Sequence, residues 1–383
     1  MPSASDDRLQ QWQSNRAARL DALPWLHTDN TTGRPVRFVA GELLVASDHE
    51  GPARDALSKQ GQSGRAVTGD QVAPGLTRLR ASGMDVAAAT RSVRGSHRDA
   101  LVGPNHVFLS SPFEIGGPFG PPAVPNNPWS LPAGPSASAS VRVAVVDTGI
   151  WRATPLPPSW YEATDDDYDD TLDDDADIGH ANFITGVIMA STSNARVRIV
   201  KVLDASGLCT EAELAKALLT LPDVDVVNLS LGGFSVDGQP PAILAFALGR
   251  LLDDADRVVV AAAGNDGDAK NPFWPAAFAG TKTPWAGQVI AVAAHDGSEV
   301  CSWSNTGPWI SMAAPGSDIV STYVTHGEFT DGLALWSGTS FAAPRVVAAI
   351  AESHATAGTI ADAVTQVRTA AESRSYGPYP GLA

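Results

Sequence analysis

Between residues 141 and 294, short apolar runs alternate with segments that have the composition of helices. The apolar runs, which are candidate strands, are 141–146, 197–203, 224–229, 258–263 and 289–294. The candidate helices between them are 180–190, 211–219 and 242–252. Uniformly apolar strands that alternate with helices are typical of a parallel sheet that is covered by helices on both faces. The sequence therefore predicts an α/β domain, which we assign to residues 141–372.

Polar residues closely follow three of these candidate strands. Asp147 follows the first strand and Ser230 the third, whereas Asn265 follows the fourth strand after one glycine. In open parallel sheets, binding sites form beyond the carboxyl ends of the strands. We therefore expect these side chains to lie at one edge of the sheet.

A further candidate site residue lies in the segment 337–344, which reads SGTSFAAP. Its glycine and hydroxyl residues stand just before the apolar run 346–351, which predicts a tight turn that leads into a buried helix. A serine at a helix start lies beside backbone N–H groups and the positive end of the helix dipole, and both stabilise an oxyanion. Serine at such a position is more often a simple helix cap, so this segment alone leaves both roles open for Ser340.

Amide cleavage by a serine needs a hydroxyl, an imidazole that takes its proton, a carboxylate that orients the imidazole, and donors for the oxyanion. Ser340 would supply the hydroxyl, and His180 is the one histidine of eight that opens an apolar helical segment after a strand-terminal aspartate. That aspartate is Asp147, and the Asn265 amide lies in a glycine-flanked loop that can face a cleft. Taken singly, His180 and Asn265 would more often be structural residues.

Residues 141–350 resemble the subtilisin-like serine proteases, the subtilases. The segments that carry the resemblance read VAVVDTGI (143–150), HANFITG (180–186), NLSLGG (228–233), AGN (263–265) and GTSFAAP (338–344). Their order is similar to that of the family. The separations along the chain from Asp147 to His180 and from His180 to Ser340 are similar to those of the family as well.

The resemblance implies a subtilisin-like fold and a serine endopeptidase that hydrolyses peptide bonds of protein or peptide substrates. It also implies the role of each candidate residue. Asp147, His180 and Ser340 would form the catalytic triad, and the Asn265 amide would form the oxyanion hole together with the Ser340 backbone N–H.

Two features bear on the substrate. The resemblance implies that the segment Ser230-Leu231-Gly232 pairs with the substrate backbone, and Asp266 is a candidate for the floor of the first specificity pocket. In the segment 165–177, nine of thirteen residues are aspartates. Such a run is typical of a solvated, self-repelling loop, with calcium ligation and attraction of basic substrates as the alternatives. Together with Asp266, the run motivates the hypothesis of a preference for basic substrates.

The histidine segment departs from the family pattern His-Gly-Thr-His, because Ala181, Asn182 and Phe183 follow His180. A Cβ atom at Ala181 limits how closely the start of the helix can approach the neighbouring strand. Two alternatives to a peptidase therefore stay open. One is a catalytically weak or inactive subtilase fold that acts as a binding or sensor protein, and the other is an esterase that uses the same triad.

The part of the chain that precedes residue 141 has a different organisation. Residues 35–111 predict the order strand, helix, strand, strand, helix, strand, which is the pattern of a small α+β, ferredoxin-like domain. Subtilases are commonly made with a propeptide of this type, so the resemblance implies a self-inhibited zymogen whose own prodomain is a partner. Residues 112–140 are rich in Pro, Gly and Ser and predict a linker that holds the processing site. Residues 1–34 predict a short helix and tail, and residues 373–383 a C-terminal tail.

Charge is distributed unevenly along the chain, whose formal net charge is −16. Residues 1–138 carry 13 Lys and Arg against 12 Asp and Glu, whereas 139–383 carry a net charge of −17. The acidic part would repel phosphates, which argues against a nucleic-acid partner.

No apolar run approaches the length of a membrane span and no signal peptide is visible, so we expect a cytoplasmic monomer, with secretion as the alternative. We expect no cofactor and no metal, with calcium as the alternative, and buried free thiols at Cys209 and Cys301.

Overall fold

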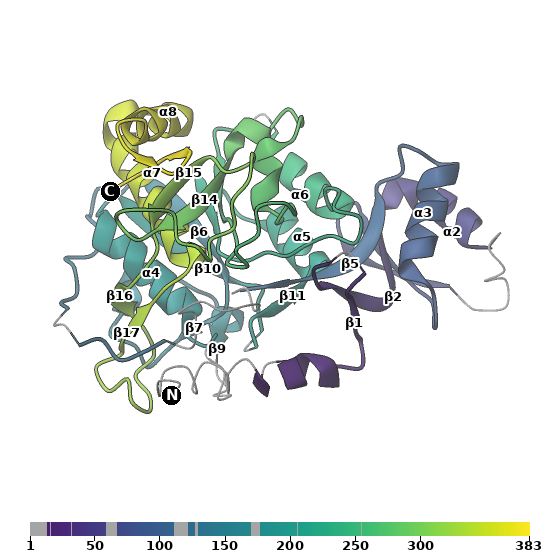
Figure 1. Ribbon diagram of the computed structural model, residues 1–383, viewed down its shortest axis with the longest axis horizontal. Coiled ribbons are helices and arrows are strands. Elements are labelled where there is room, and N and C mark those ends of the chain that lie inside the picture. The colour runs from purple at the N-terminus through teal and green to yellow at the C-terminus, as the bar shows by residue number, and fades with distance from the viewer. Residues whose placement is uncertain are drawn as a thin grey trace.

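The computed structural model describes residues 14–15, 17–31, 33–58, 67–110, 122–126, 129–169, 177–204, 206–253 and 255–383. The chain forms a larger unit from residue 141 to the C-terminus and a smaller unit over residues 26–109 (Figure 1). Each unit is built on its own sheet, and the sheet of the smaller unit takes in one short strand of the larger unit. Within the described residues, no helix is both long and apolar enough to cross a membrane.

The larger unit is built on a seven-stranded sheet. In spatial order its strands are β15 (Met312–Pro315), β14 (Val289–His295), β13 (Val258–Ala262), β12 (Val226–Leu229), β6 (Val141–Asp147), β10 (Ala195–Lys201) and β8 (Tyr161–Glu162). All neighbouring strands run parallel. Every residue of β12, β13 and β14 is buried, which requires cover on both faces. The predicted parallel sheet is confirmed.

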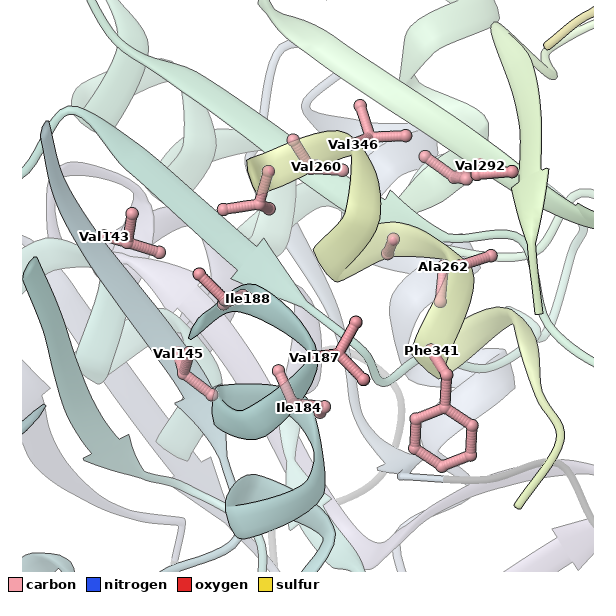
Figure 2. Close-up of a cluster of buried hydrophobic side chains, with 14 of the residues drawn as sticks. Val143, Val145, Ile184, Val187, Ile188, Val260, Ala262, Val292, Phe341 and Val346 are labelled. Atoms are coloured by element: carbon pink, nitrogen blue, oxygen red, sulfur yellow. The ribbon is translucent and has the colours of Figure 1, made fainter. Parts of the chain in front are cut away.

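Helices cover both faces of this sheet. The helices are α4 (His180–Ser191), α5 (Glu211–Thr220), α6 (Ala242–Leu252), α7 (Thr339–Ala357) and α8 (Ile360–Ala371). Because side chains alternate along a strand, Val143 and Val145 of β6 face the core formed with α4 and α7, while Ala144 and Val146 face the core formed with α5 and α6. Figure 2 shows the first of these cores, with Val143 and Val145 beside α4.

The smaller unit has an antiparallel sheet with two helices against one face. Its elements are β1 (Leu26–Asp29), β2 (Val36–Ala46), α2 (Glu50–Leu57), β3 (Thr68–Ala73), β4 (Leu76–Arg80), α3 (Val86–Ser96) and β5 (Val102–Leu109). From β2 to β5 the chain therefore runs strand, helix, strand, strand, helix, strand. Leu43 and Val45 of β2 face α2 and α3, whereas Leu44, on the opposite face, lies in the core of α5 and α6.

Strand β5 joins the two units, and Figure 1 shows it between them. One edge of β5 pairs with β2, and the other edge pairs antiparallel with β11 (Leu208–Thr210) of the larger unit. Helices α5 and α6 contact the smaller sheet on the face that α2 and α3 leave open. As a result, the central strands β2 and β5 of the smaller sheet are largely buried, and the end of β5 reaches the carboxyl edge of the larger sheet.

The shorter elements anchor the connecting and terminal segments. Strand β17 (Leu333–Trp336) pairs with β16 (Ile319–Thr322) and with Ala123 of the proline-rich linker, and β7 (Ile150–Trp151) pairs with β9 (Tyr168–Asp169). The final residues, expected to be a tail, form the hairpin of β18 (Ser375–Tyr376) and β19 (Tyr379–Pro380). The chain end is also fixed, because the N–H of Leu382 donates to the Ala313 carbonyl at 3.0 Å.

Candidate active site

Asp147 and His180 meet at the carboxyl edge of the larger sheet. Asp147 is the last residue of β6, His180 is the first of α4, and both are fully buried. The Nδ1 atom of His180 lies 2.7 Å from Asp147 Oδ1. Because a carboxylate can only accept a hydrogen bond, Nδ1 carries the proton and Nε2 is left as the acceptor. The same Oδ1 atom accepts the N–H of Thr148 at 2.7 Å, and Thr148 Oγ1 accepts the N–H of Ala181 at 3.0 Å, so the turn after β6 holds the start of α4.

Gly179 fixes the point at which α4 begins. Its φ angle is +85°, in the left-handed region that glycine adopts without strain. A Cβ atom at this position would also lie 2.7 Å from Cγ1 of Val324. Another residue would therefore displace the helix start, and with it the imidazole of His180.

The departures from the family pattern after His180 have structural roles of their own. The Asn182 side chain accepts the N–H of Trp151 at 2.8 Å and donates to the carbonyl of Trp151 at 3.0 Å. The ring of Phe183 packs against that of Phe341 with their centroids 4.3 Å apart. These residues tie α4 to β7 and to α7, and they leave the hydrogen bond between the imidazole and the carboxylate intact.

Aromatic rings enclose the imidazole of His180. The ring of Trp336 stands edge-on to it at 5.5 Å, and the ring of Phe341 lies at the same centroid distance. Among the described residues, Nε2 of His180 has no hydrogen-bond partner. The surroundings therefore orient the imidazole while its accepting nitrogen stays available for chemistry.

Ser340 is the second residue of α7 and is 2% exposed. Its Oγ atom lies 3.2 Å from the carbonyl oxygen of Ser110 and 3.2 Å from that of Ser230. Ser110 directly follows β5, so one of the two carbonyl groups that can accept this hydroxyl lies at the end of the smaller unit, and among the described residues the hydroxyl is not bonded to His180.

Pro344 couples this serine to the opposite side of the site. It lies inside α7, where the N–H of residue 344 would otherwise bond to the carbonyl of Ser340. That carbonyl instead accepts the hydroxyl of Ser230 at 2.8 Å, and Asn228 Nδ2 donates to the Ser230 oxygen at 2.9 Å. Ser230 therefore positions Ser340, a role that our sequence analysis did not assign. The proline four residues after Ser340 was the signal that could have revealed it.

Asn265 presents an oriented amide beside Ser340. Its Oδ1 atom accepts the backbone N–H of Thr339 at 2.8 Å and the hydroxyl of Thr339 at 2.7 Å. Because both partners donate, the oxygen must face them and Nδ2 must face away. Nδ2 has no partner within the part of the chain that the structure describes. The first N–H groups of α7 also lack acceptors inside the helix, so the amide and the Ser340 N–H can stabilise the same oxyanion.

The segment Ser230-Leu231-Gly232 lies alongside the end of β5. Gly232 and Leu109 exchange two backbone hydrogen bonds of 2.9 Å, and the N–H of Ser110 donates to the Gly207 carbonyl at 2.9 Å. The side chain of Leu231 is buried in the core of α5 and α6, so this residue offers only its backbone to the cleft. An extended segment of the smaller unit thus occupies the position expected for a substrate strand.

Asp266 follows Asn265 but is bonded to Asn305, which lies in the loop after β14. Its carboxylate accepts Nδ2 of Asn305 at 3.0 Å, and its N–H donates to Oδ1 of Asn305 at 2.9 Å. These two bonds assign the Asp266 carboxylate a part in holding the loop after β13.

Part of the aspartate run also packs against the site. Asp169 forms a salt bridge of 2.8 Å with Lys201, and burial raises the pKa of the Asp169 carboxyl. The guanidinium of Arg152 lies 3.4 Å above the ring of Tyr168. Residues 170–176 of the run lie outside the described residues. Within the described ones, no group of three or more side chains is arranged to hold a metal ion.

Comparisons with known proteins identify the family of this chain. A family model described as the subtilase family matches residues 138–373. The thermophilic serine proteinase of Bacillus sp. (strain AK1) is 28% identical over 335 residues, which cover 81% of this chain and 76% of that protein. Thermitase of Thermoactinomyces vulgaris is 31% identical over 231 residues, which cover 57% of this chain and 75% of that protein.

A solved structure shows the same fold. The crystal structure of fervidolysin from Fervidobacterium pennivorans matches with a TM-score of 0.61 at 18% identity, covering 90% of this chain and 60% of that chain. The family match spans more than half of this chain, including all the residues of the candidate site. The chain therefore belongs to the subtilase family, the subtilisin-like serine endopeptidases.

Proposed function

We propose that this chain hydrolyses peptide bonds through the triad Asp147, His180 and Ser340 and is made as a self-inhibited zymogen. In this mechanism, Nε2 of His180 takes the proton from Ser340 Oγ as the oxygen attacks a peptide carbonyl, and then gives it to the leaving amine. Asp147 holds the imidazole and stabilises its cation. The Asn265 amide and the Ser340 N–H stabilise the oxyanion.

The observation that carries the zymogen proposal is the position of β5. A substrate must pair its backbone with the cleft and bring a carbonyl to the nucleophile. Leu109 pairs with Gly232, and the carbonyl oxygen of Ser110 lies 3.2 Å from Ser340 Oγ. We propose that residues 35–111 form a prodomain that fills the substrate site, and that the first cut falls directly after residue 110 or 111.

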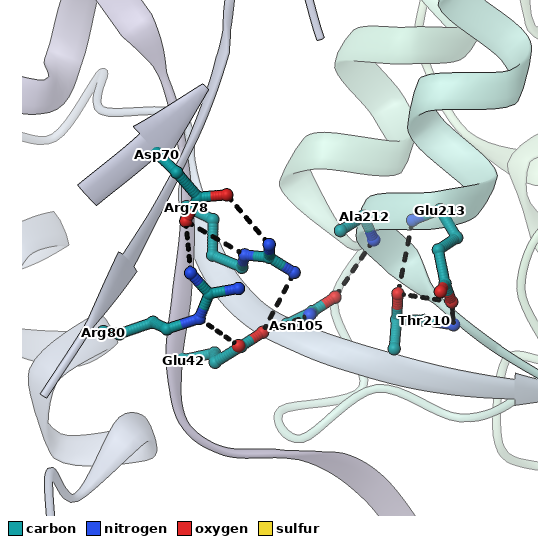
Figure 3. Close-up of polar contacts among 8 residues, drawn as sticks. All are labelled: Glu42, Asp70, Arg78, Arg80, Asn105, Thr210, Ala212 and Glu213. Atoms are coloured by element: carbon teal, nitrogen blue, oxygen red, sulfur yellow. Dashed lines mark hydrogen bonds and ion pairs between the residues drawn. The ribbon is translucent and has the colours of Figure 1, made fainter. Parts of the chain in front are cut away.

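Buried polar contacts support the role of the smaller unit as an inhibitor. Figure 3 shows Asn105 between the two units. Its side chain donates to Glu42 at 2.7 Å and accepts the N–H of Ala212, at the start of α5, at 3.0 Å. Beside it, Nδ1 of His106 lies 2.6 Å from Glu211, whose other oxygen accepts the N–H of Leu244 at 2.8 Å. Contacts of this kind would hold the prodomain after the chain is cut.

The intact mass of the purified protein tests this proposal. We expect the wild type to lose an N-terminal fragment that ends at residue 110 or 111, because Ser110 lies at the nucleophile, whereas the Ser340→Ala variant stays whole. Restoring the serine in that variant should restore the cut. A wild type that stays uncut, or a variant that is cut at the same place, would contradict self-processing.

Labelling with a fluorophosphonate probe separates an enzyme from an inactive binding protein. The processed wild type should react at Ser340, and Ser340→Ala should not react. The side-chain partners of Asn182 and Phe183 favour the enzyme, because these departures from the family pattern leave the bond between His180 and Asp147 at 2.7 Å. Comparing matched peptide and ester substrates separates a peptidase from an esterase.

A further inference from the structure

The residue whose carbonyl is attacked, here called the acyl residue, must place its side chain beside two glycines. Its carbonyl carbon has to reach Ser340 Oγ while its oxygen faces the Asn265 amide. Two segments flank this position: 230–232, which pairs with β5, and 263–265, which carries the amide.

Gly232 lies opposite Leu109, so a Cβ atom on Gly232 and the side chain of Leu109 face the same side, and the next residue, Ser110, places its Oγ atom beside Gly207 instead. Because side chains alternate along a strand, an acyl residue two positions after the one opposite Gly232 points its side chain back to the side of Gly232 and Gly264.

The ring of Phe273 fills the space between these glycines. A Cβ atom on Gly232 would lie 2.3 Å from Cε1 of Phe273, and a Cβ atom on Gly264 would lie 3.0 Å from both Cδ atoms of the ring. The same ring thus touches the backbone on both sides of the space. Because the ring is already in contact with both walls, a second large side chain has no room between them.

Neighbouring contacts hold the ring in place. Trp274, the next residue, exchanges two backbone hydrogen bonds of 2.8 and 2.9 Å with Gly233. The ring of Phe234 packs edge-on against Phe273 with centroids 5.4 Å apart, and Val36 of the smaller unit completes this cluster. Val36 would leave with the prodomain, but the contacts to Trp274, Gly233 and Phe234 belong to the larger unit and would persist in the processed enzyme.

We infer that Phe273 restricts the acyl residue to small side chains such as those of Gly, Ala and Ser. This inference rests on the proposed peptidase function and names its substrate class. The chain's own sequence fits the restriction, because residues 110 and 111 are both serine. It replaces the hypothesis of a basic preference, since the Asp266 carboxylate is bonded to Asn305 and the space that a basic side chain would enter holds the Phe273 ring.

The test uses processed enzyme and peptides that differ only at the acyl residue, which is Ala, Ser, Phe or Arg. For the wild type, we expect kcat/KM for Ala and Ser to exceed that for Phe and Arg by at least about 10-fold, the size typical of exclusion by a filled pocket. In Phe273→Ala, the ratio of kcat/KM for Phe over Ala should rise at least about 10-fold. Phe246→Ala is the matched control, because this half-buried ring of α6 lies beside Gly75 of the smaller unit, and it should shift that ratio by less than about 3-fold.

Two further outcomes keep the inference falsifiable. If Phe273→Ala fails to fold or to process, peptide aldehydes that end in Ala or Phe are competed against the fluorophosphonate probe on the wild type. The Ala aldehyde should protect Ser340 at a concentration at least about 10-fold lower than the Phe aldehyde does. Equal protection, or equal cleavage of the Phe and Ala peptides, would overturn the inference while probe labelling still supported the peptidase. An enzyme that the probe does not label would instead contradict the proposed function.

Discussion

The catalytic edge of the larger sheet and its contact with the smaller unit use polar groups in opposite ways. At the catalytic edge, Asp147 and Thr339 orient the imidazole of His180 and the amide of Asn265 while, among the described residues, Nε2 and Nδ2 are left without partners. At the contact, both the oxygen and the nitrogen of the Asn105 side chain are bonded. A catalytic side chain must be oriented by one hydrogen bond while a second donor or acceptor atom stays free for the substrate. A tightly bound interface, in contrast, is most stable when every buried polar atom has a hydrogen-bond partner.

The largest effect should come from removing the charge that orients the imidazole. We expect Asp147→Asn to slow self-processing by about 10⁴-fold, because an amide can stabilise the wrong tautomer of His180. The rate is read from the appearance of the cut fragment by intact mass. Asp169→Asn is the control, since Asp169 is also buried at this edge but pairs with Lys201. If the two variants process at similar rates, the assigned role of Asp147 is wrong.

Loss of the oxyanion amide should have a smaller effect on the same edge. Asn265→Ala should lower kcat by about 10²- to 10³-fold with little change in KM, because the amide acts on the charge of the transition state. Steady-state kinetics on peptide substrates measures both parameters. Asn305→Ala removes a neighbouring amide that bonds to the Asp266 loop, and we expect it to lower kcat much less. An equal loss in both variants would point to a general loosening of the loop.

Much of the catalytic edge was predictable from sequence, and most of the contact between the units was not. Asp147, His180 and Ser340 lie at the end or start of an element and Asn265 in the loop that follows β13, and parallel topology brings such positions to one edge. The bond from Asn105 to Ala212 joins residues 107 positions apart and carries no periodic or motif signal. Phe273 was missed for the same reason, because only its contact with two glycines distinguishes it from other loop aromatics.

At the contact between the two units, Asn105→Ala should weaken the binding of the prodomain to the larger unit. The change leaves Glu42 and the N–H of Ala212 without this partner, which costs about 1–3 kcal/mol when such groups stay buried. We therefore expect the interval between processing and full peptidase activity to shorten at least several-fold. Asp55→Ala alters an exposed residue of α2 and should leave the interval unchanged. An unchanged interval in Asn105→Ala would show that the network does not limit release.

The smallest predicted effect is on the pH dependence of stability. It concerns the ion pair between Arg34 Nε and Asp268 Oδ2, which lie 2.7 Å apart. Burial raises the pKa of Asp268, but hydrogen bonds from Asn271, Lys270 and Arg34 outweigh it and lower the pKa below the ordinary value of 3.8. A lowered folded-state pKa contributes stability above the unfolded value, and that stability is lost as pH falls through the folded value.

We therefore compare Asp268→Asn with its parent, both in the uncut Ser340→Ala background. Between pH 6 and about pH 3, the free energy of unfolding should fall less in Asp268→Asn than in the parent, and the two decreases should differ by about 1 kcal/mol or less. Denaturant unfolding at the two pH values measures this difference. Identical losses with and without the Asp268 carboxylate would show that its titration does not contribute.

Pro344 shows how a missing backbone hydrogen bond in one helix can link two parts of a site. Most residues at this position would close the backbone ladder of α7 and satisfy the Ser340 carbonyl locally. With proline, that carbonyl accepts the hydroxyl of Ser230 at 2.8 Å instead. The segment 230–232 and the start of α7 are thereby held in a fixed alignment. α7 loses one backbone hydrogen bond at this position. In exchange, a hydrogen bond between Ser230 and Ser340 fixes the distance between the segment 230–232 and the start of α7.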